Sequence, residues 1–98
     1  MINIINQIFE MEQKMLTKQD ISLDRNIKRL YHEFEEIGYK IINPLGKRYK
    51  ETDADLEAKI SGDFKDNMIV TRVLKPVIYR MVSNNDPELL QRGIVIVE

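Results

Sequence analysis

Few side chains in this sequence are of the types that perform catalysis or bind metals. There is one histidine, His32, and no cysteine, so a disulfide framework, a thiolate metal site and a cysteine nucleophile are excluded. Asp53, Asp55 and Glu57 are close in sequence but lack the glycine and the spacing of a calcium loop, which favours a solvated loop. The glycines are too scattered to form a phosphate-binding loop. We therefore expect a binding protein and not an enzyme, with no catalytic residue, metal or cofactor.

The composition is that of one small soluble domain. The chain has 98 residues, of which 43% are hydrophobic and 32% are charged. Its formal net charge of −1 gives no general attraction to nucleic acid or to an anionic membrane, so we expect neither as a partner. The sequence shows neither a signal peptide nor an apolar run long enough to cross a bilayer. We therefore expect a cytoplasmic protein.

Two amphipathic helices are predicted, over residues 3–18 and 23–37, because apolar side chains recur there at spacings of three and four. The stripes consist of Ile4, Ile8, Met11 and Met15 in the first helix and of Leu23, Ile27, Leu30 and Phe34 in the second. Gly38 is a typical residue to end the second helix. A helical hairpin with such a seam is half of a four-helix bundle, so we expect a homodimer through these eight residues. The pattern leaves open whether the first helix packs within its own chain or swaps between protomers.

The remaining residues predict a small all-β domain over 39–98, after a dimerisation domain over 1–38. The expected strands lie at residues 41–42, 56–60, 68–74, 77–82 and 89–97. Pro76 interrupts the sheet because proline cannot donate to a strand ladder, and Gly93 permits a bulge or a close backbone approach. Residues 83–87 read as a hairpin loop. Because residues 94–97 are all apolar, both their faces should be covered, which favours a closed sheet or a small sandwich. The expected fold class is α+β.

Two alternatives concern charged segments. The three cations around Tyr49, at residues 47–50, form either a contact for an acidic partner surface or a solvated edge that discourages strand pairing. A winged helix-turn-helix is disfavoured, because Glu33, Glu35 and Glu36 would face the phosphates from the second helix.

Residues 23–98 resemble the GrpE family, the nucleotide exchange factors of DnaK-type chaperones. The passage G-Y-K-I-I-N-P-L-G-K-R-Y (residues 38–49) followed by L-E-A-K-I (56–60) is similar to the family's transition from its last bundle helix into its β domain. V-T-R-V-L-K-P-V-I-Y (70–79) and E-L-L-Q-R-G-I-V-I-V (88–97) are similar to its two closing strands. The sequence departs from the family where Leu56 replaces a preferred histidine and Arg92-Gly93 replaces proline-alanine. We expect a short member without the family's long N-terminal helix.

The resemblance implies a co-chaperone in protein folding and the stress response. In the family, the β domain binds the ATPase domain of the chaperone and promotes release of ADP. The matching positions imply partner contacts at Tyr49, Arg72, Leu74, Lys75 and Arg92. For Tyr49 and Leu74 the alternative is core packing, and for the three cations it is solubility. The alternative function is a structural or adaptor dimer that keeps the fold but has no exchange activity.

Overall fold

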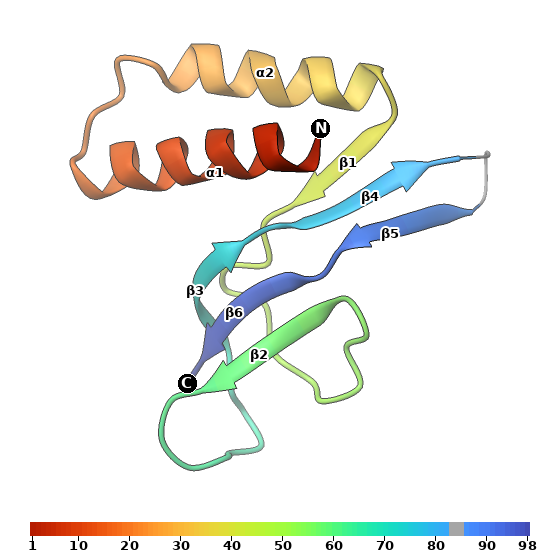
Figure 1. Cartoon of the computed structure of the whole chain (residues 1–98). Coiled ribbons are helices and arrows are strands. Elements are labelled where there is room, and N and C mark those ends of the chain that lie inside the picture. Colours follow the sequence, from red (N-terminus) through yellow and green to blue (C-terminus); the bar gives the residue numbers. More distant parts are fainter. Residues whose placement is uncertain (83–85) are drawn as a thin grey trace.

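The computed structural model describes residues 1–82 and 86–98, which form two helices followed by short strands (Figure 1). Helix α1 spans Ile2–Thr17 and helix α2 spans Asp24–Glu36. The strands are β1 (Tyr39–Ile42), β2 (Leu56–Ile60), β3 (Val70–Lys75), β4 (Val77–Met81), β5 (Pro87–Gln91) and β6 (Gly93–Val97). The α+β class predicted from the sequence is confirmed.

Gly38 ends α2, as predicted, and directly precedes β1. It adopts a φ of +98°, a conformation that L side chains rarely adopt, and its N–H donates to the carbonyl oxygen of Glu35 at 3.0 Å. Its own carbonyl oxygen accepts from the N–H of Met81 at 2.8 Å. The end of the helix is therefore joined directly to the end of β4.

The sheets are built on one long antiparallel hairpin that is interrupted in both arms. β4 pairs with β5, and β3 pairs with β6, with Pro76 separating the strands of one arm and Arg92 those of the other. β1 adds to the first half and gives the order β1-β4-β5; β2 adds to the second and gives β2-β6-β3. β2 runs parallel to β6, although the other named pairs are antiparallel. The hairpin thus passes from one sheet into the other (Figure 1).

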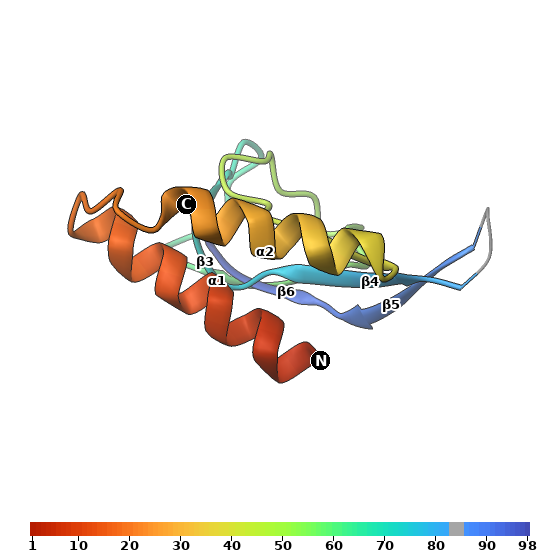
Figure 2. The ribbon, with the colours of Figure 1, turned by 90° about the horizontal axis from the view of Figure 1, so that it is seen from above.

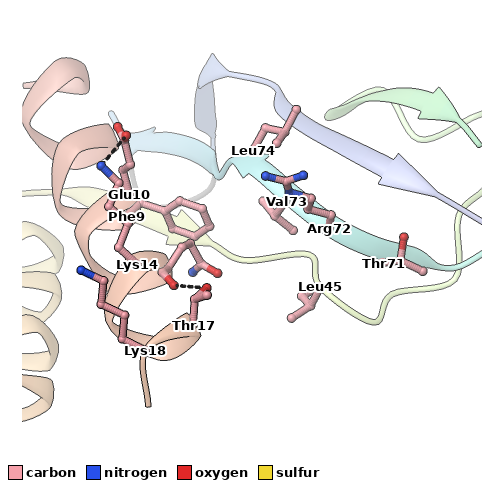
Figure 3. Close-up of a pocket in the computed structure, with 11 residues that line it drawn as sticks. Phe9, Glu10, Lys14, Thr17, Lys18, Leu45, Thr71, Arg72, Val73 and Leu74 are labelled. Carbon is pink, nitrogen blue, oxygen red and sulfur yellow. Dashed lines mark hydrogen bonds and ion pairs between the residues drawn. The ribbon is translucent and has the colours of Figure 1, made fainter. Parts of the chain in front are cut away.

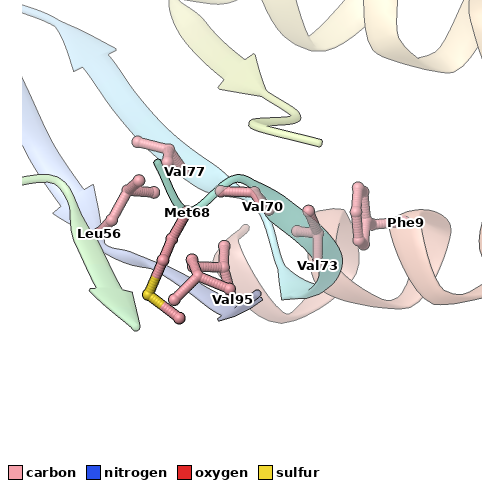
Figure 4. Packing of buried hydrophobic residues seen from close by; sticks show 8 residues of the cluster. Phe9, Leu56, Met68, Val70, Val73, Val77 and Val95 are labelled. Carbon is pink, nitrogen blue, oxygen red and sulfur yellow. The ribbon is translucent and has the colours of Figure 1, made fainter. Parts of the chain in front are cut away.

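Buried side chains form two clusters on this scaffold. The larger contains Leu56, Met68, Val70, Val73, Val77, Val95 and Val97 of the β domain together with Phe9 of α1 (Figure 4). The smaller joins Ile5 and Ile8 of α1, Ile27 and Phe34 of α2, and Ile78 of β4. The helices therefore share their core with the sheet β1-β4-β5, beside which they lie in Figure 2.

Four expectations about the strands and the loop between them need correction. The predicted last strand is two strands, β5 and β6, in different sheets. In the described part of the chain both sheets are open, with β1, β5, β2 and β3 at their ends, so the closed sheet, one of the two expected arrangements, does not form there. Ile94 and Ile96 are only half-buried, so one face of β6 is partly uncovered. Of the predicted hairpin loop, residues 83–85 lie outside the described residues, and Pro87 already belongs to β5.

Candidate partner-binding surface

Two irregularities in β3 bring most of its side chains to the surface. Its register against β6 shifts between Val70 and Arg72 and again between Val73 and Lys75. The inward-facing residues Val70 and Val73 are consequently three positions apart, where a regular strand would place them two apart. The other four residues of the strand are exposed; these are Thr71, Arg72, Leu74 and Lys75. The sequence gives no local signal for these shifts.

One exposed side of β3 borders a groove against α1 (Figure 3). The groove has a volume of about 550 Å³. Arg72 and Leu74 lie on the β3 wall, and Leu74 is 41% exposed although it is apolar. The opposite wall is formed by α1 residues, including Phe9 and Gln13, and by Lys18, which directly follows the helix. Two of the sequence-predicted site residues are therefore brought together here.

The outer face of the sheet β2-β6-β3 has an apolar centre with charged flanks. In the register of the sheet, Ile94 lies between Glu57 of β2 and Lys75 of β3. Ile96 lies in the same way between Lys59 and Arg72, so three cations and one carboxylate surround the two isoleucines. Such a face suits an acidic protein surface with an apolar centre. Arg72 and Lys75 were predicted from the sequence as contact residues, but the two isoleucines were not, because both faces of residues 94–97 were expected to be covered.

Arg92 lies at the same end of the sheet but is engaged within the chain. Its guanidinium donates a hydrogen bond to the carbonyl oxygen of Leu56, at the start of β2. The next residue, Gly93, is closely packed: a Cβ atom there would lie 2.8 Å from Cγ2 of Val77 and 3.0 Å from Cδ2 of Leu56. The close backbone approach predicted at Gly93 is therefore confirmed. Arg92 is held beside β2 by this hydrogen bond.

Tyr49 is half-buried and packs against the larger core cluster, so core packing, the alternative interpretation, describes its position. Its N–H donates to the carbonyl oxygen of Met68 at 2.8 Å. The neighbouring cations also have partners within the chain: Lys47 lies 3.7 Å from the Asp53 carboxylate, and Arg48 donates to the Asn67 side chain at 2.7 Å. Contacts of Tyr49 with a partner stay a prediction.

The eight residues of the predicted helical seam divide between the core and the surface. Ile8, Ile27 and Phe34 are buried, and Met15 is half-buried against the smaller cluster. The other four alternate with these along the stripes and are exposed: Ile4 by 54%, Met11 by 50%, Leu23 by 45% and Leu30 by 43%. A single chain thus buries one half of the seam residues in its own core and leaves the other half exposed to solvent.

Two titratable side chains of α2, His32 and Tyr31, have carboxylate partners within the chain. His32 is exposed and lies 3.5 Å from the carboxylate of Glu36 on the same helix. Among residues 1–82 and 86–98, no cluster of His, Cys, Asp or Glu could hold a metal ion. The hydroxyl of Tyr31 donates to Glu12 at 3.0 Å, and desolvation, followed by the charge of Glu12 and this hydrogen bond, raises the tyrosine pKa well above its ordinary value. Neither α1 nor α2, the helices of the described residues, has the length and apolar character that a membrane crossing requires.

Comparisons with protein-family models, with curated proteins and with solved structures found no match to this chain.

Proposed function

We propose that this protein is a GrpE-like co-chaperone of the cytoplasm, which binds the ATPase domain of a DnaK-type chaperone and promotes release of ADP. The observation that carries the proposal is the composition of one sheet. Three of the segments that resemble the family, L-E-A-K-I in β2, V-T-R-V-L-K in β3 and G-I-V-I-V in β6, are neighbours in the order β2-β6-β3. Segments far apart in the sequence therefore contribute to one surface.

The chemistry of that surface fits a protein partner. Leu74, Ile94 and Ile96 offer apolar contact area, and Arg72 and Lys75 flank it with positive charge. In protein interfaces an apolar centre supplies most of the affinity, whereas charges at the rim steer association and select the partner. The proposed contact residues on this sheet are therefore Arg72, Leu74 and Lys75 of β3, which are exposed, and Ile94 and Ile96 of β6, which are half-buried.

The proposed mechanism makes and breaks no covalent bond. A factor that binds the open form of the ATPase domain more tightly than the closed form shifts the population towards the open form. ADP, which is held between the lobes of the closed form, then dissociates faster. Only the difference between the two affinities has this effect, because equal binding to both forms would shift nothing.

Dimerisation through the helices is the second part of the proposal. The chain exposes 7113 Å² of surface, compared with about 5,800 Å² expected for a compact protein of this mass. Its radius of gyration is 14.4 Å, compared with about 13 Å for a compact domain of this length. The exposed half of the helical seam, which includes Ile4, Met11, Leu23 and Leu30, is the apolar surface that a second copy would cover in a four-helix bundle.

An adaptor without exchange activity is the second candidate. It is favoured by Arg92 and Tyr49, two of the contact residues that the family resemblance implies, because both are engaged within the chain. Such a protein would bind the chaperone equally well with and without ADP.

Linkage supplies the test of the proposed function. If the protein weakens ADP binding, ADP must weaken binding of the protein to the ATPase domain by the same factor. We expect calorimetric titration of a DnaK-type ATPase domain to give a lower Kd without nucleotide than with saturating ADP. Equal values would support the adaptor, and absence of binding in both conditions would exclude both candidates.

A further inference from the structure

The groove between α1 and β3 contains a polar group without a partner. The side-chain nitrogen Nε2 of Gln13 is shielded from solvent and has no hydrogen-bond partner among the described residues. The Gln13 carbonyl oxygen, by contrast, accepts from the Thr17 hydroxyl at 2.9 Å. A shielded amide nitrogen without an acceptor is costly, so such groups are nearly always paired. Gln13 also lines the groove, so its shielded nitrogen gains a carbonyl or carboxylate oxygen of a ligand as acceptor once the side chain turns into the groove.

The groove also borders an open strand edge. Residues 46–48 cover the outer edge of the sheet only as far as Val70, whose N–H and carbonyl oxygen bond to Lys47 and Gly46 at 2.9 Å each. Beyond Val70, β3 is the terminal strand of β2-β6-β3 in the described part of the chain, and residues 71–74 line the groove. An exposed edge of this kind accepts an additional strand from another chain.

In the described part of the chain, the unpaired charges of the groove are positive and favour an acidic ligand. Lys14 is paired with Glu10 at 3.4 Å, but Lys18 and Arg72 have no ion-pair partner within 4.0 Å among the described residues. Lys18 directly follows α1, and Arg72 lies on β3 (Figure 3). Leu45 and Leu74, exposed by 55 and 41%, add apolar surface to the same wall as Arg72.

We propose that this groove binds an extended acidic segment of a partner protein. The segment continues the sheet along β3, and its carboxylates contact Lys18 and Arg72. The Gln13 side chain turns into the groove and donates its hydrogen bond to an oxygen atom of the segment. This site goes beyond the proposed exchange function, because Gln13 of α1 and Lys18, directly after α1, lie outside the proposed chaperone contact. Since Arg72 and Leu74 belong to both surfaces, the acidic segment and the chaperone compete for the protein.

The test uses the full chain and a fluorescent peptide of alternating leucine and glutamate. We expect the fluorescence anisotropy of the peptide to rise when it binds the protein. The affinity of the peptide for the protein should fall as salt is added. Matched peptides carry glutamine or lysine in place of glutamate and should bind more weakly. Equal binding of the glutamine peptide, or no binding of the acidic one, would overturn the proposal. Tighter binding of a single-stranded oligonucleotide would also overturn it, since the ligand would then be a nucleic acid.

Variants locate the peptide. Lys18→Glu and Gln13→Leu should each weaken peptide binding, the first on the order of tenfold, whereas Lys65→Glu makes the same charge change in the loop after β2 and should have no effect. Circular dichroism verifies that each variant is folded. Unchanged peptide affinity in folded Lys18→Glu would place the peptide elsewhere and contradict the proposal. Because Lys18→Glu should keep chaperone binding, failure of this inference and failure of the exchange function are distinguishable.

Discussion

The side-chain amides of Asn6 and Gln91, 85 positions apart in the sequence, exchange two hydrogen bonds of 2.8 Å. Gln91 also donates to the carbonyl oxygen of Pro76 at 2.8 Å. This pair therefore fastens α1 to the end of β5 and to the point where the other hairpin arm changes sheets. The position of α1, and with it one wall of the groove, depends on this contact.

Replacing Asn6 should loosen this attachment. In Asn6→Ala, Gln91 keeps its bond to Pro76 but loses its other partner in a partly buried position, and we expect the free energy of unfolding to fall by about 1–2 kcal/mol. Urea unfolding measures the change. The control is Gln7→Ala, on the neighbouring exposed position of α1, which should stay within about 0.5 kcal/mol of the original protein. Equal effects of the two substitutions would show that the amide pair does not hold α1.

Gly93→Ala should destabilise the centre of the sheet. The added methyl would lie 2.8 Å from Cγ2 of Val77, and overpacking of this kind costs about 1–3 kcal/mol. Urea unfolding again gives the change in free energy. Val77→Ala removes the obstructing methyl, so Gly93→Ala should cost less in that background. Additive effects in this double-mutant cycle would contradict the packing that the structure describes around Gly93.

Tyr31 should make the protein sensitive to alkaline pH. Its pKa is raised in the folded state, mainly by burial, so this contribution to stability is complete below the ordinary tyrosine pKa of about 10. Above that pH the unfolded chain loses the Tyr31 proton while the folded chain retains it. Stability should then fall by up to about 1.4 kcal/mol per pH unit from this group. In Tyr31→Phe, the free energy of unfolding, measured with urea at a series of pH values, should fall less at alkaline pH. Identical pH profiles of the two proteins would contradict the burial of Tyr31 beside Glu12.

Dimerisation should depend on the exposed half of the helical seam. We expect light scattering of the original protein to give about twice the chain mass of 11.6 kDa. Leu30→Asp places a charge on the exposed apolar stripe of α2 and should yield a monomer. Ile21→Asp changes a more exposed isoleucine, at 79%, in the connection between the helices and should leave the dimer intact. A monomeric mass for the original protein at micromolar concentration would contradict this part of the proposal.

The local pattern of the sequence predicted the elements better than their arrangement. The spacing of Ile27 and Phe34 placed α2, Gly38 ended it, and Pro76 marked the break between β3 and β4. The parallel pairing of β2 with β6 was not predictable, because it joins segments that no local pattern connects. The short segment that forms β5 has two adjacent leucines and no alternation, so it was not recognised as a separate strand.

The candidate site was predicted only in part for a related reason. Arg72, Leu74 and Lys75 were identified through the resemblance, and the structure places all three on the surface of β3. Their exposure depends on the register shifts against β6, which are a property of the pair of strands and not of β3 alone. Gln13 of the groove was missed because its unpartnered nitrogen becomes visible only once α1 is placed beside β3.

The most direct measurement of the central claim is the rate at which fluorescent ADP leaves a DnaK-type chaperone after mixing with this protein and excess unlabelled nucleotide. The original protein should accelerate release, with a rate that rises and saturates with its concentration. Leu74→Asp should lose this effect while staying folded and dimeric, whereas Leu89→Asp, at a leucine of similar exposure on β5 (38% against 41%), should keep it. Release unaffected by saturating amounts of the original protein would contradict the account.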